Sequence, residues 1–268
     1  MPARPIITLT TDFGTTDHYV GAVKGAILSV AADAVIVDIT HDIPPHDVMT
    51  AAWVIARAVP VFPRRTIHVA VTDPTVGTAR RPILIVTDEH LLIGPDNGLF
   101  SFVLEASPPS RIIALTTLHY MREPVSATFH ARDIFGPVAA HLTRGVDPAN
   151  FGDTMETSVR LELPRPAMTP QRTVRATVIH VDRFGNLILN VTRPGLEALL
   201  GSDARTIAVV AGGARVETMV TTYAEAAAGA PALLYNSSGF LEIAANRSRA
   251  SEALGLMAGA VVEVVPRV

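Results

Sequence analysis

An acidic and a basic side chain lie on either side of one sharp turn in this sequence, where they could act together on a polar substrate. The apolar run Ile67 to Val71 is typical of a buried strand and is followed closely by Asp73. Pro74 ends the run, Gly77 allows the chain to turn back, and Arg80 follows. Ligands of open α/β sheets bind at the carboxyl ends of strands, so this is a candidate site. Taken alone, the pattern favours a structural ion pair that closes the turn.

Two further carboxylates follow the first apolar run of the chain. Asp12 comes directly after Ile6 to Thr11, and Asp17 lies in the same loop. If this strand lies beside the one that ends near Asp73, the carboxylates share one cleft. Carboxylates accept hydrogen bonds from a ribose diol, and they also attract a cationic ligand. Turn formation and helix capping explain Asp12 and Asp17 equally well.

The nine histidines do not form a recognisable metal-binding pattern. His41 and His46 lie near acids, but no HExxH motif and no close histidine pair with a third ligand is present. His130 is the stronger candidate, because it precedes an expected helix between Phe129 and the pair Arg132-Asp133. No GxSxG, Walker or GxGxxG motif is present, so a serine-hydrolase elbow, a P-loop and a dinucleotide site are not supported.

The composition restricts the classes of protein to consider. With 268 residues, 49% hydrophobic and 18% charged, the chain can bury a large core, and disorder is not expected. A net charge of −3 without a basic block argues against nucleic acid as a partner. Cysteine is absent, which excludes disulfides and thiolate chemistry. We find no signal peptide and no apolar run of membrane-spanning length, so we expect a cytoplasmic protein without a membrane partner.

The first half of the chain alternates strand-like runs with segments of helical periodicity. The expected strands cover residues 6–11, 35–39, 67–71, 83–86, 91–93 and 112–115. The expected helices cover residues 19–31, 48–59 and 134–142, and Asp47 can cap the second of them. This alternation predicts an α/β domain with a mostly parallel sheet covered on both faces.

The second half of the chain has a different pattern. Residues 164–172 contain three prolines and predict a stiff linker between an N-terminal domain, 1–163, and a C-terminal domain, 173–268. The helical period then fades, and the turn Asp182 to Asn186 predicts a hairpin. Expected strands cover residues 174–181, 187–191, 207–210, 232–235, 240–243 and 261–265. We therefore expect a smaller C-terminal β-barrel.

Seven ordered segments make the chain similar to one enzyme family. They are TDFGTTDHYVGAVKG (11–25), DITHDIPPHDV (38–48), VTDPTVGTARRPI (71–83), GPDNGLF (94–100), TFHARDIFGPVAAHL (128–142), VDRFGNLILN (181–190) and NSSGFLEIAANR (236–247). Through these segments the chain resembles the S-adenosyl-L-methionine (SAM) hydrolases (adenosine-forming), or SAM hydroxide adenosyltransferases, relatives of the fluorinase and chlorinase enzymes. The resemblance implies an α/β N-domain, a β-barrel C-domain and a homotrimer with sites at subunit interfaces.

The resemblance also implies roles for individual residues. Asp73, Arg80 and His130 match the set that positions and activates water, although the adjacent Arg81 leaves the choice of arginine open. The family usually has glycine at the position of Thr75. The implied substrate-binding residues are Asp12 at the ribose, His46 near the sugar, Asp17 and Asp182 at the methionine amino group, Phe184 and Asn186 at the adenine, Ser237, Ser238 and Asn246 in a loop closing over the ligand, and Tyr235 and Glu242 beside that loop.

The implied reaction converts SAM and water into adenosine and L-methionine, with no cofactor and no metal. A sulfonium is already a good leaving group, so the chemical task is to hold and activate water in line with the C5′–S bond. Two alternatives stay open: a SAM-dependent halogenase, and a regulator that binds SAM or adenosine without turnover. The carboxylate of Asp73 argues against a halide at the same place.

Overall fold

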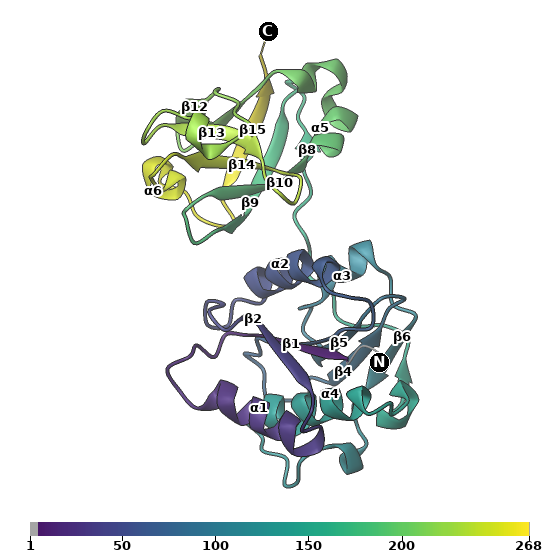
Figure 1. Cartoon of the computed structure of the whole chain (residues 1–268). Helices are drawn as coiled ribbons and strands as arrows, with labels where there is room; N and C mark the ends of the chain where they lie inside the picture. The colour runs from purple at the N-terminus through teal and green to yellow at the C-terminus, as the bar shows by residue number, and fades with distance from the viewer. Residues whose placement is uncertain (1–4, 268) are drawn as a thin grey trace. The chain divides into compact units, whose positions relative to one another are not determined.

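The computed structural model describes residues 5–267 of the chain. The chain divides into two compact units, Met1–Glu162 and Leu163–Val268. Figure 1 shows helices packed around a sheet in the first unit and mostly strands in the second. The expected α/β domain followed by a smaller β domain is therefore present.

The first unit is built on a seven-stranded mixed sheet in the order β2-β1-β3-β5-β4-β6-β7. β2, β1, β3 and β5 are parallel neighbours, whereas β4, β6 and β7 join through antiparallel pairs. The parallel half contains β1 and β3, the two strands that end just before Asp12 and Asp73. The strands are β1 (Ile6–Thr11), β2 (Val35–Thr40), β3 (Ile67–Val71), β4 (Pro82–Val86), β5 (Leu91–Pro95), β6 (Arg111–Ala114) and β7 (Thr154–Met155).

Helices cover both faces of this sheet (Figure 1). The helices are α1 (Tyr19–Val30), α2 (Val48–Ala58), α3 (Ser101–Ala106) and α4 (Gly136–Thr143), the last preceded by a π-helical turn, Ala131–Phe135. Side chains alternate between the faces of a strand, so Leu84 packs in the core beside α1 and α4, while Ile83 and Ile85 pack beside α2 and α3. Asp47 caps α2 as expected, because its carboxylate accepts a 2.9 Å hydrogen bond from the Thr50 amide.

The second unit is a strongly curved antiparallel sheet in the order β12-β11-β15-β9-β10-β14-β13, with β8 beside β9. The Leu233 backbone in β13 bonds to Thr218 and Val220, which follow β12, so the two ends of the sheet meet and the barrel nearly closes. Its elements are β8 (Ala167–Met168), β9 (Val174–Val181), β10 (Leu187–Thr192), α5 (Arg193–Leu200), β11 (Ile207–Ala211), β12 (Ala214–Val216), β13 (Pro231–Tyr235), β14 (Phe240–Ala245), α6 (Ala250–Leu254) and β15 (Val261–Pro266).

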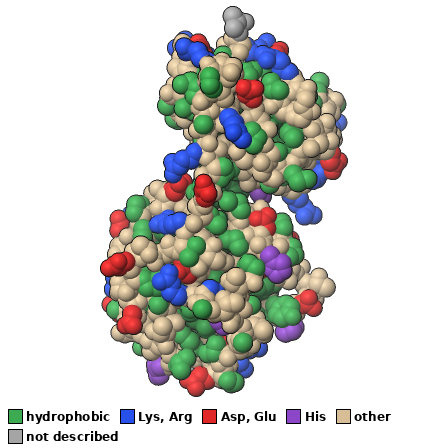
Figure 2. Space-filling model, turned by 180° about the vertical axis from the view of Figure 1, so that it is seen from behind, with side chains coloured by type: hydrophobic (Ala, Val, Ile, Leu, Met, Phe, Trp, Pro, Cys, Tyr) green, Lys and Arg blue, Asp and Glu red, His purple; other side chains and the backbone are tan. Residues whose placement is uncertain are grey.

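Acidic and basic side chains are intermixed over both units on the face shown in Figure 2. This face of the described residues therefore carries no broad basic patch of the kind that binds nucleic acid.

Two histidines are buried in the first unit, at the end of the sheet away from Asp73. His68 lies in β3 and His90 just before β5, with their ring centroids 5.0 Å apart. The Thr8 hydroxyl lies 2.7 Å from His68 Nδ1, and Arg64 and Glu89 are the nearby charged groups. Burial, and then the neighbouring His90, lowers the pKa of His68 to about 3. Burial also lowers the pKa of His90. Both rings are therefore neutral at pH 7.

This buried pair predicts that the fold loses stability in mild acid. In the unfolded chain His68 binds a proton below about pH 6.5, whereas in the folded protein it does so only below about pH 3. Between these pH values the unfolded state binds more protons, so the free energy of unfolding falls as the pH falls. Each pH unit costs up to about 1.4 kcal/mol per ring. Urea unfolding at pH 7 and pH 5 measures the effect. His68→Gln should show a smaller difference between the two pH values, and an identical difference would contradict the assignment.

Candidate active site

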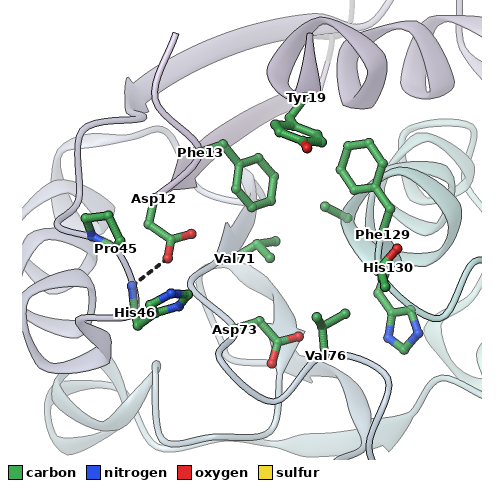
Figure 3. A pocket seen from close by; sticks show the side chains of 12 residues that line it. Asp12, Phe13, Tyr19, Pro45, His46, Val71, Asp73, Val76, Phe129 and His130 are labelled. Carbon is green, nitrogen blue, oxygen red and sulfur yellow. Dashed lines mark hydrogen bonds between the residues drawn. The ribbon is translucent and has the colours of Figure 1, made fainter. Parts of the chain in front are cut away.

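A cavity of about 270 Å³ opens at the carboxyl ends of β1 and β3 in the first unit. Figure 3 shows the side chains of Asp12, Asp73 and His130 arranged around it, beside a group of aromatic rings. The loop after β1, the loop after β3 and the segment before the π-helical turn therefore converge at one place, as expected for an α/β sheet. The lining residues are Asp12, Phe13, Tyr19, Pro45, His46, Val71, Asp73, Val76, Thr128, Phe129, His130 and Ala131.

Asp73 and Arg80 form a nearly buried ion pair beside this cavity. The Arg80 Nε donates to Asp73 Oδ2 at 2.8 Å, and Arg80 Nη2 donates to the same oxygen. Their side chains are only 4% and 6% exposed, so the pair is shielded from solvent. The other oxygen, Oδ1, accepts from the Thr75 amide at 3.3 Å and from the Thr75 hydroxyl at 3.2 Å. Thr75 thus supports the carboxylate from the opposite side.

His130 joins this pair through the arginine. Arg80 Nη2 lies 2.7 Å from His130 Nδ1. A guanidinium only donates hydrogen bonds, so Nδ1 must accept, and the ring proton lies on Nε2. Burial, and then the positive charge of Arg80, lowers the pKa of His130. The imidazole is therefore neutral at pH 7, and it offers an Nε2–H donor and no free basic nitrogen.

The structure distinguishes between the two adjacent arginines. Arg81 points to a different carboxylate, with its Nε donating to Asp96 Oδ2 at 2.9 Å. Arg80 is thus the arginine that contacts both Asp73 and His130. Its guanidinium also lies over the Phe135 ring, 5.6 Å from the centroid. Phe135 belongs to the π-helical turn that directly follows His130, so this turn supports both side chains.

Asp12 lies on the other side of the cavity. Its Oδ2 accepts a 2.9 Å hydrogen bond from the His46 amide, and Figure 3 shows the carboxylate facing the cavity. His46 has a positive φ of 68°, which is uncommon for a residue other than glycine, and it turns its amide toward Asp12. A second bond, from the Gly14 amide to the His41 carbonyl, joins the same two loops. The two loops therefore hold Asp12 in place.

An aromatic wall completes the cavity, and sequence reasoning assigned it no role. Tyr19 and Phe129 pack edge to face with centroids 5.4 Å apart, and Phe13 contacts both rings at 6.1 Å. The signal was present, because each ring is close in sequence to a candidate polar residue. Asp17 is exposed and is not among the residues that line this cavity.

The second unit has a cavity of its own, of about 540 Å³. Three of the expected binding residues line it: Asp182, Phe184 and Asn186. The Asp182 carboxylate accepts from the amides of Phe184 and Asn186 and from the Asn186 side chain, each at 2.9 Å. Asp182 therefore builds the turn that presents the Phe184 ring, which is 74% exposed. Residues that sequence reasoning did not single out also line it, among them Tyr223, Arg247 and Arg249.

Glu242 lies buried next to this second cavity. It is 2% exposed and accepts from the Tyr223 hydroxyl at 3.0 Å and from Asn236 Nδ2 at 3.1 Å. Burial raises the pKa of Glu242, and burial followed by the charge of Glu242 raises the pKa of Tyr223 to about 12. Tyr223 therefore remains a hydrogen-bond donor at neutral pH, and it ties the cavity wall to β14.

The remaining expected residues lie outside the lining of the second cavity. Ser237 and Ser238 are exposed on the turn between β13 and β14. The Tyr235 ring lies under the Arg193 guanidinium, 4.4 Å from the centroid, and packs against the barrel core. Asn246 donates through Nδ2 to the Ala226 carbonyl at 2.8 Å and so fixes a neighbouring loop.

Among residues 5–267, no group of three His, Cys, Asp or Glu side chains is arranged to hold a metal ion. No helix in the described part of the chain is long and apolar enough to cross a membrane.

Comparison with known proteins identifies the family. The sequence pattern of the SAM hydroxide adenosyltransferase N-terminal domain matches residues 7–152, and that of the C-terminal domain matches residues 176–263. The α/β unit and the β-barrel unit that follows it therefore correspond to the two domains of one enzyme family. The chain belongs to the SAM hydroxide adenosyltransferase family.

Individual relatives agree with this placement. A protein named (R)-S-adenosyl-L-methionine hydrolase from Salinispora arenicola is 38% identical over 264 residues, covering 97% of each chain. A protein named fluorinase from an Actinoplanes species is 28% identical over 295 residues, covering 98% of this chain and 99% of its own. A solved structure of an uncharacterised conserved protein from Thermotoga maritima superposes with a TM-score of 0.90 at 32% identity, covering 97% of this chain and 99% of that one.

Proposed function

We propose that this protein hydrolyses SAM to adenosine and L-methionine. The observation that carries the proposal is the hydrogen-bonded set of Asp73, Arg80 and His130 beside the cavity of a family member. The family and the greater similarity to a named hydrolase than to a named fluorinase support the same reaction. The reaction consumes one water and releases one proton, and neither a cofactor nor a metal takes part.

The hydrogen bonds among Asp73, Arg80 and His130 suggest a separate role for each residue in the reaction. Water attacks C5′ as the C5′–S bond breaks, and the electron pair of that bond leaves with the sulfur of methionine. Asp73 lines the cavity and takes the water proton, which then passes to solvent. Arg80 contacts both the Asp73 carboxylate and the His130 ring, and it thereby fixes the distance between them. His130, whose Nδ1 is occupied, orients the water as a donor through Nε2–H. Such positioning can contribute about 7–11 kcal/mol at its best.

Substrate binding draws on further residues of the two cavities and on residues of the loops outside their linings. Asp12 accepts hydrogen bonds from the ribose hydroxyls, and His46 packs near the sugar. Asp17 and Asp182 attract the methionine ammonium, while Phe184 and Asn186 hold the adenine. The residues proposed to form or support a closing loop are Tyr235, Ser237, Ser238, Glu242 and Asn246. SAM is a metabolite of the cytoplasm, so we propose that the protein works there.

The direct test is product analysis of purified protein incubated with SAM. Chromatography should show adenosine and methionine in equal amounts, with the same rate in EDTA. A rate abolished by EDTA and restored by a divalent ion would contradict the metal-free mechanism. A 5′-halo-5′-deoxyadenosine formed with chloride or fluoride would indicate a halogenase. Bound SAM without turnover would indicate a regulator.

Asp12→Ala is expected to weaken SAM binding more than it slows turnover. A ribose contact is made in both the ground state and the transition state, so its loss raises KM and leaves kcat nearly unchanged. Losing hydrogen bonds to a charged group costs about 1.5–3 kcal/mol, which corresponds to about a 10- to 100-fold rise in KM. Steady-state kinetics measure both constants, with the exposed Asp33→Ala as the matched control. A fall in kcat at unchanged KM would reject the ribose assignment.

We propose further that the protein is a homotrimer whose sites are shared between subunits. The proposal rests on the family resemblance and on the division of polar groups between two separate cavities. A ring with a head-to-tail contact joins the first unit of one chain to the second unit of its neighbour. Mixing inactive Asp73→Asn and Asn186→Ala chains after dissociation should then restore activity. If activity does not recover although mass analysis verifies that the subunits have exchanged, the shared site is rejected. The proposed hydrolysis of SAM would not be affected by that result.

A further inference from the structure

The turn Gly94 to Gly98 has no role in the reaction described above, yet it contains a buried charge. The Asp96 side chain, at the end of β5, is only 2% exposed. A buried carboxylate is costly unless it is paired and hydrogen-bonded. The partners of Asp96 therefore show what the turn holds in place.

Asp96 holds one end of the loop between β3 and β4, which carries Asp73 and Arg80. Its Oδ2 accepts from Arg81 Nε at 2.9 Å and from Arg81 Nη2, and its amide donates to the Arg81 carbonyl at 2.9 Å. This backbone bond extends the β4–β5 ladder one step beyond the pair Pro82 and Pro95. Successive side chains along such a ladder point to opposite sides. Holding Arg81 on one side therefore directs Arg80 to the other, toward Asp73.

The next residue of the same turn holds the other end of the loop. Asn97 Nδ2 donates to the Thr72 carbonyl at 2.8 Å, directly before Asp73. The turn Gly94 to Gly98 therefore binds the chain at two points, one residue before Asp73 and one residue after Arg80. The loop between them carries both members of the ion pair, so the spacing of its ends depends on the turn.

The turn itself is anchored from a third direction. Asp96 Oδ1 accepts from the Val159 amide at 2.7 Å, and the Ser101 hydroxyl accepts from the Leu161 amide at 2.8 Å. Gly98 has a φ of +91°, and a side chain there would come within 2.7 Å of Leu161. Both Asp96 oxygens are therefore occupied, and the segment 159–161 packs tightly against the turn.

We propose that Asp96 is a positioning residue: through Arg81 it sets the direction of Arg80, and hence the Arg80 contacts to Asp73 and His130. The part concerning turnover rests on the proposed hydrolysis of SAM, whereas the part concerning His130 does not. Asp96 itself is not among the residues that line the cavity, so it would act through Arg81.

The decisive variant is Asp96→Asn. Asparagine can still accept from the Val159 amide through its oxygen, but its NH₂ group would face the Arg81 donors and break that pair. Arg81→Lys is the milder second variant, because it keeps the charge and loses the two-pronged contact. Glu89→Gln is the matched control, since Glu89 forms an exposed ion pair with Arg64 at the other end of β5.

Two readouts on the full-length folded protein test the proposal. Displacement of Arg80 should lower kcat by up to about 10²-fold with little change of KM for SAM. In an NMR titration of the His130 ring, both variants should raise the pKa of His130, because the Arg80 charge that lowers it has moved. Glu89→Gln should change neither quantity.

A double-mutant cycle separates an effect of Asp96 on the position of Arg80 from a general loss of order in the protein. In an Arg80→Gln background, Asp96→Asn should cause little further loss of kcat, because both changes remove the same contact. Additive losses, or an Asp96→Asn protein with wild-type kcat and an unchanged His130 titration, would overturn the proposal. If wild-type protein does not turn over SAM, the proposed function fails, and the NMR titration of Asp96→Asn still decides the positioning claim.

Discussion

Replacing Asp73 with asparagine is expected to lower kcat for SAM hydrolysis by about 10²-fold or more. The amide cannot take a proton from water, and it would turn an NH₂ group toward the donors of Arg80 or Thr75. KM should change little, because the attacking water gains most from Asp73 in the transition state. The measurement is steady-state kinetics with adenosine quantified by chromatography.

A matched control is Asp88→Asn, which removes an exposed carboxylate from a loop of the same unit. It should retain wild-type kcat, and thermal unfolding should show that both variants are folded. An Asp73→Asn protein with near-normal turnover would mean that another group activates the water.

The second large effect is expected for Arg80→Gln. Arg80 contacts both Asp73 and His130, so its loss should also reduce kcat by about 10²-fold or more. It should change the pH profile as well. The Arg80 charge, after burial, lowers the pKa of His130, so removing it raises that pKa. Protonation of Nδ1 would end its role as a hydrogen-bond acceptor and displace the ring, so kcat falls as the pH drops through the pKa of His130. This acidic limb should move to higher pH in the variant.

Arg80→Lys is the informative comparison for this prediction. It keeps a positive charge beside His130 but cannot donate to Asp73 and His130 from one rigid plane. Its kcat should be low while its acidic limb stays close to that of the wild type. An unshifted limb in Arg80→Gln would show that the charge of Arg80 does not control His130.

Much of the fold could be predicted because buried strands have a simple local pattern. The apolar runs that became β1, β3 and β9 are bounded by turn residues, and their observed limits agree with the predicted ones. Shorter elements carry a weaker signal. α3 and α6 have six and five residues, too few to display a helical period, and neither was predicted. α5 was also missed, although Thr192 caps it through the Gly195 amide.

The site was predictable only in part, because contacts across the fold leave no local signal. Asp73 could be proposed from its place at a strand end, but Arg80 and Arg81 are equivalent in the sequence. Only the register that continues to Asp96 separates them. Likewise, Tyr223 shares a cavity with Phe184 because the curved sheet brings distant residues together.

The central claim is that water attacks C5′ of SAM, and the most direct test is hydrolysis in H₂¹⁸O with mass analysis of both products. Attack of water at C5′ should place one ¹⁸O atom in adenosine, at the 5′-oxygen, and none in methionine. Unlabelled adenosine would contradict it, because the 5′-oxygen would then not come directly from water. Free adenine or methylthioadenosine would contradict it too, because these products require a bond other than C5′–S to break.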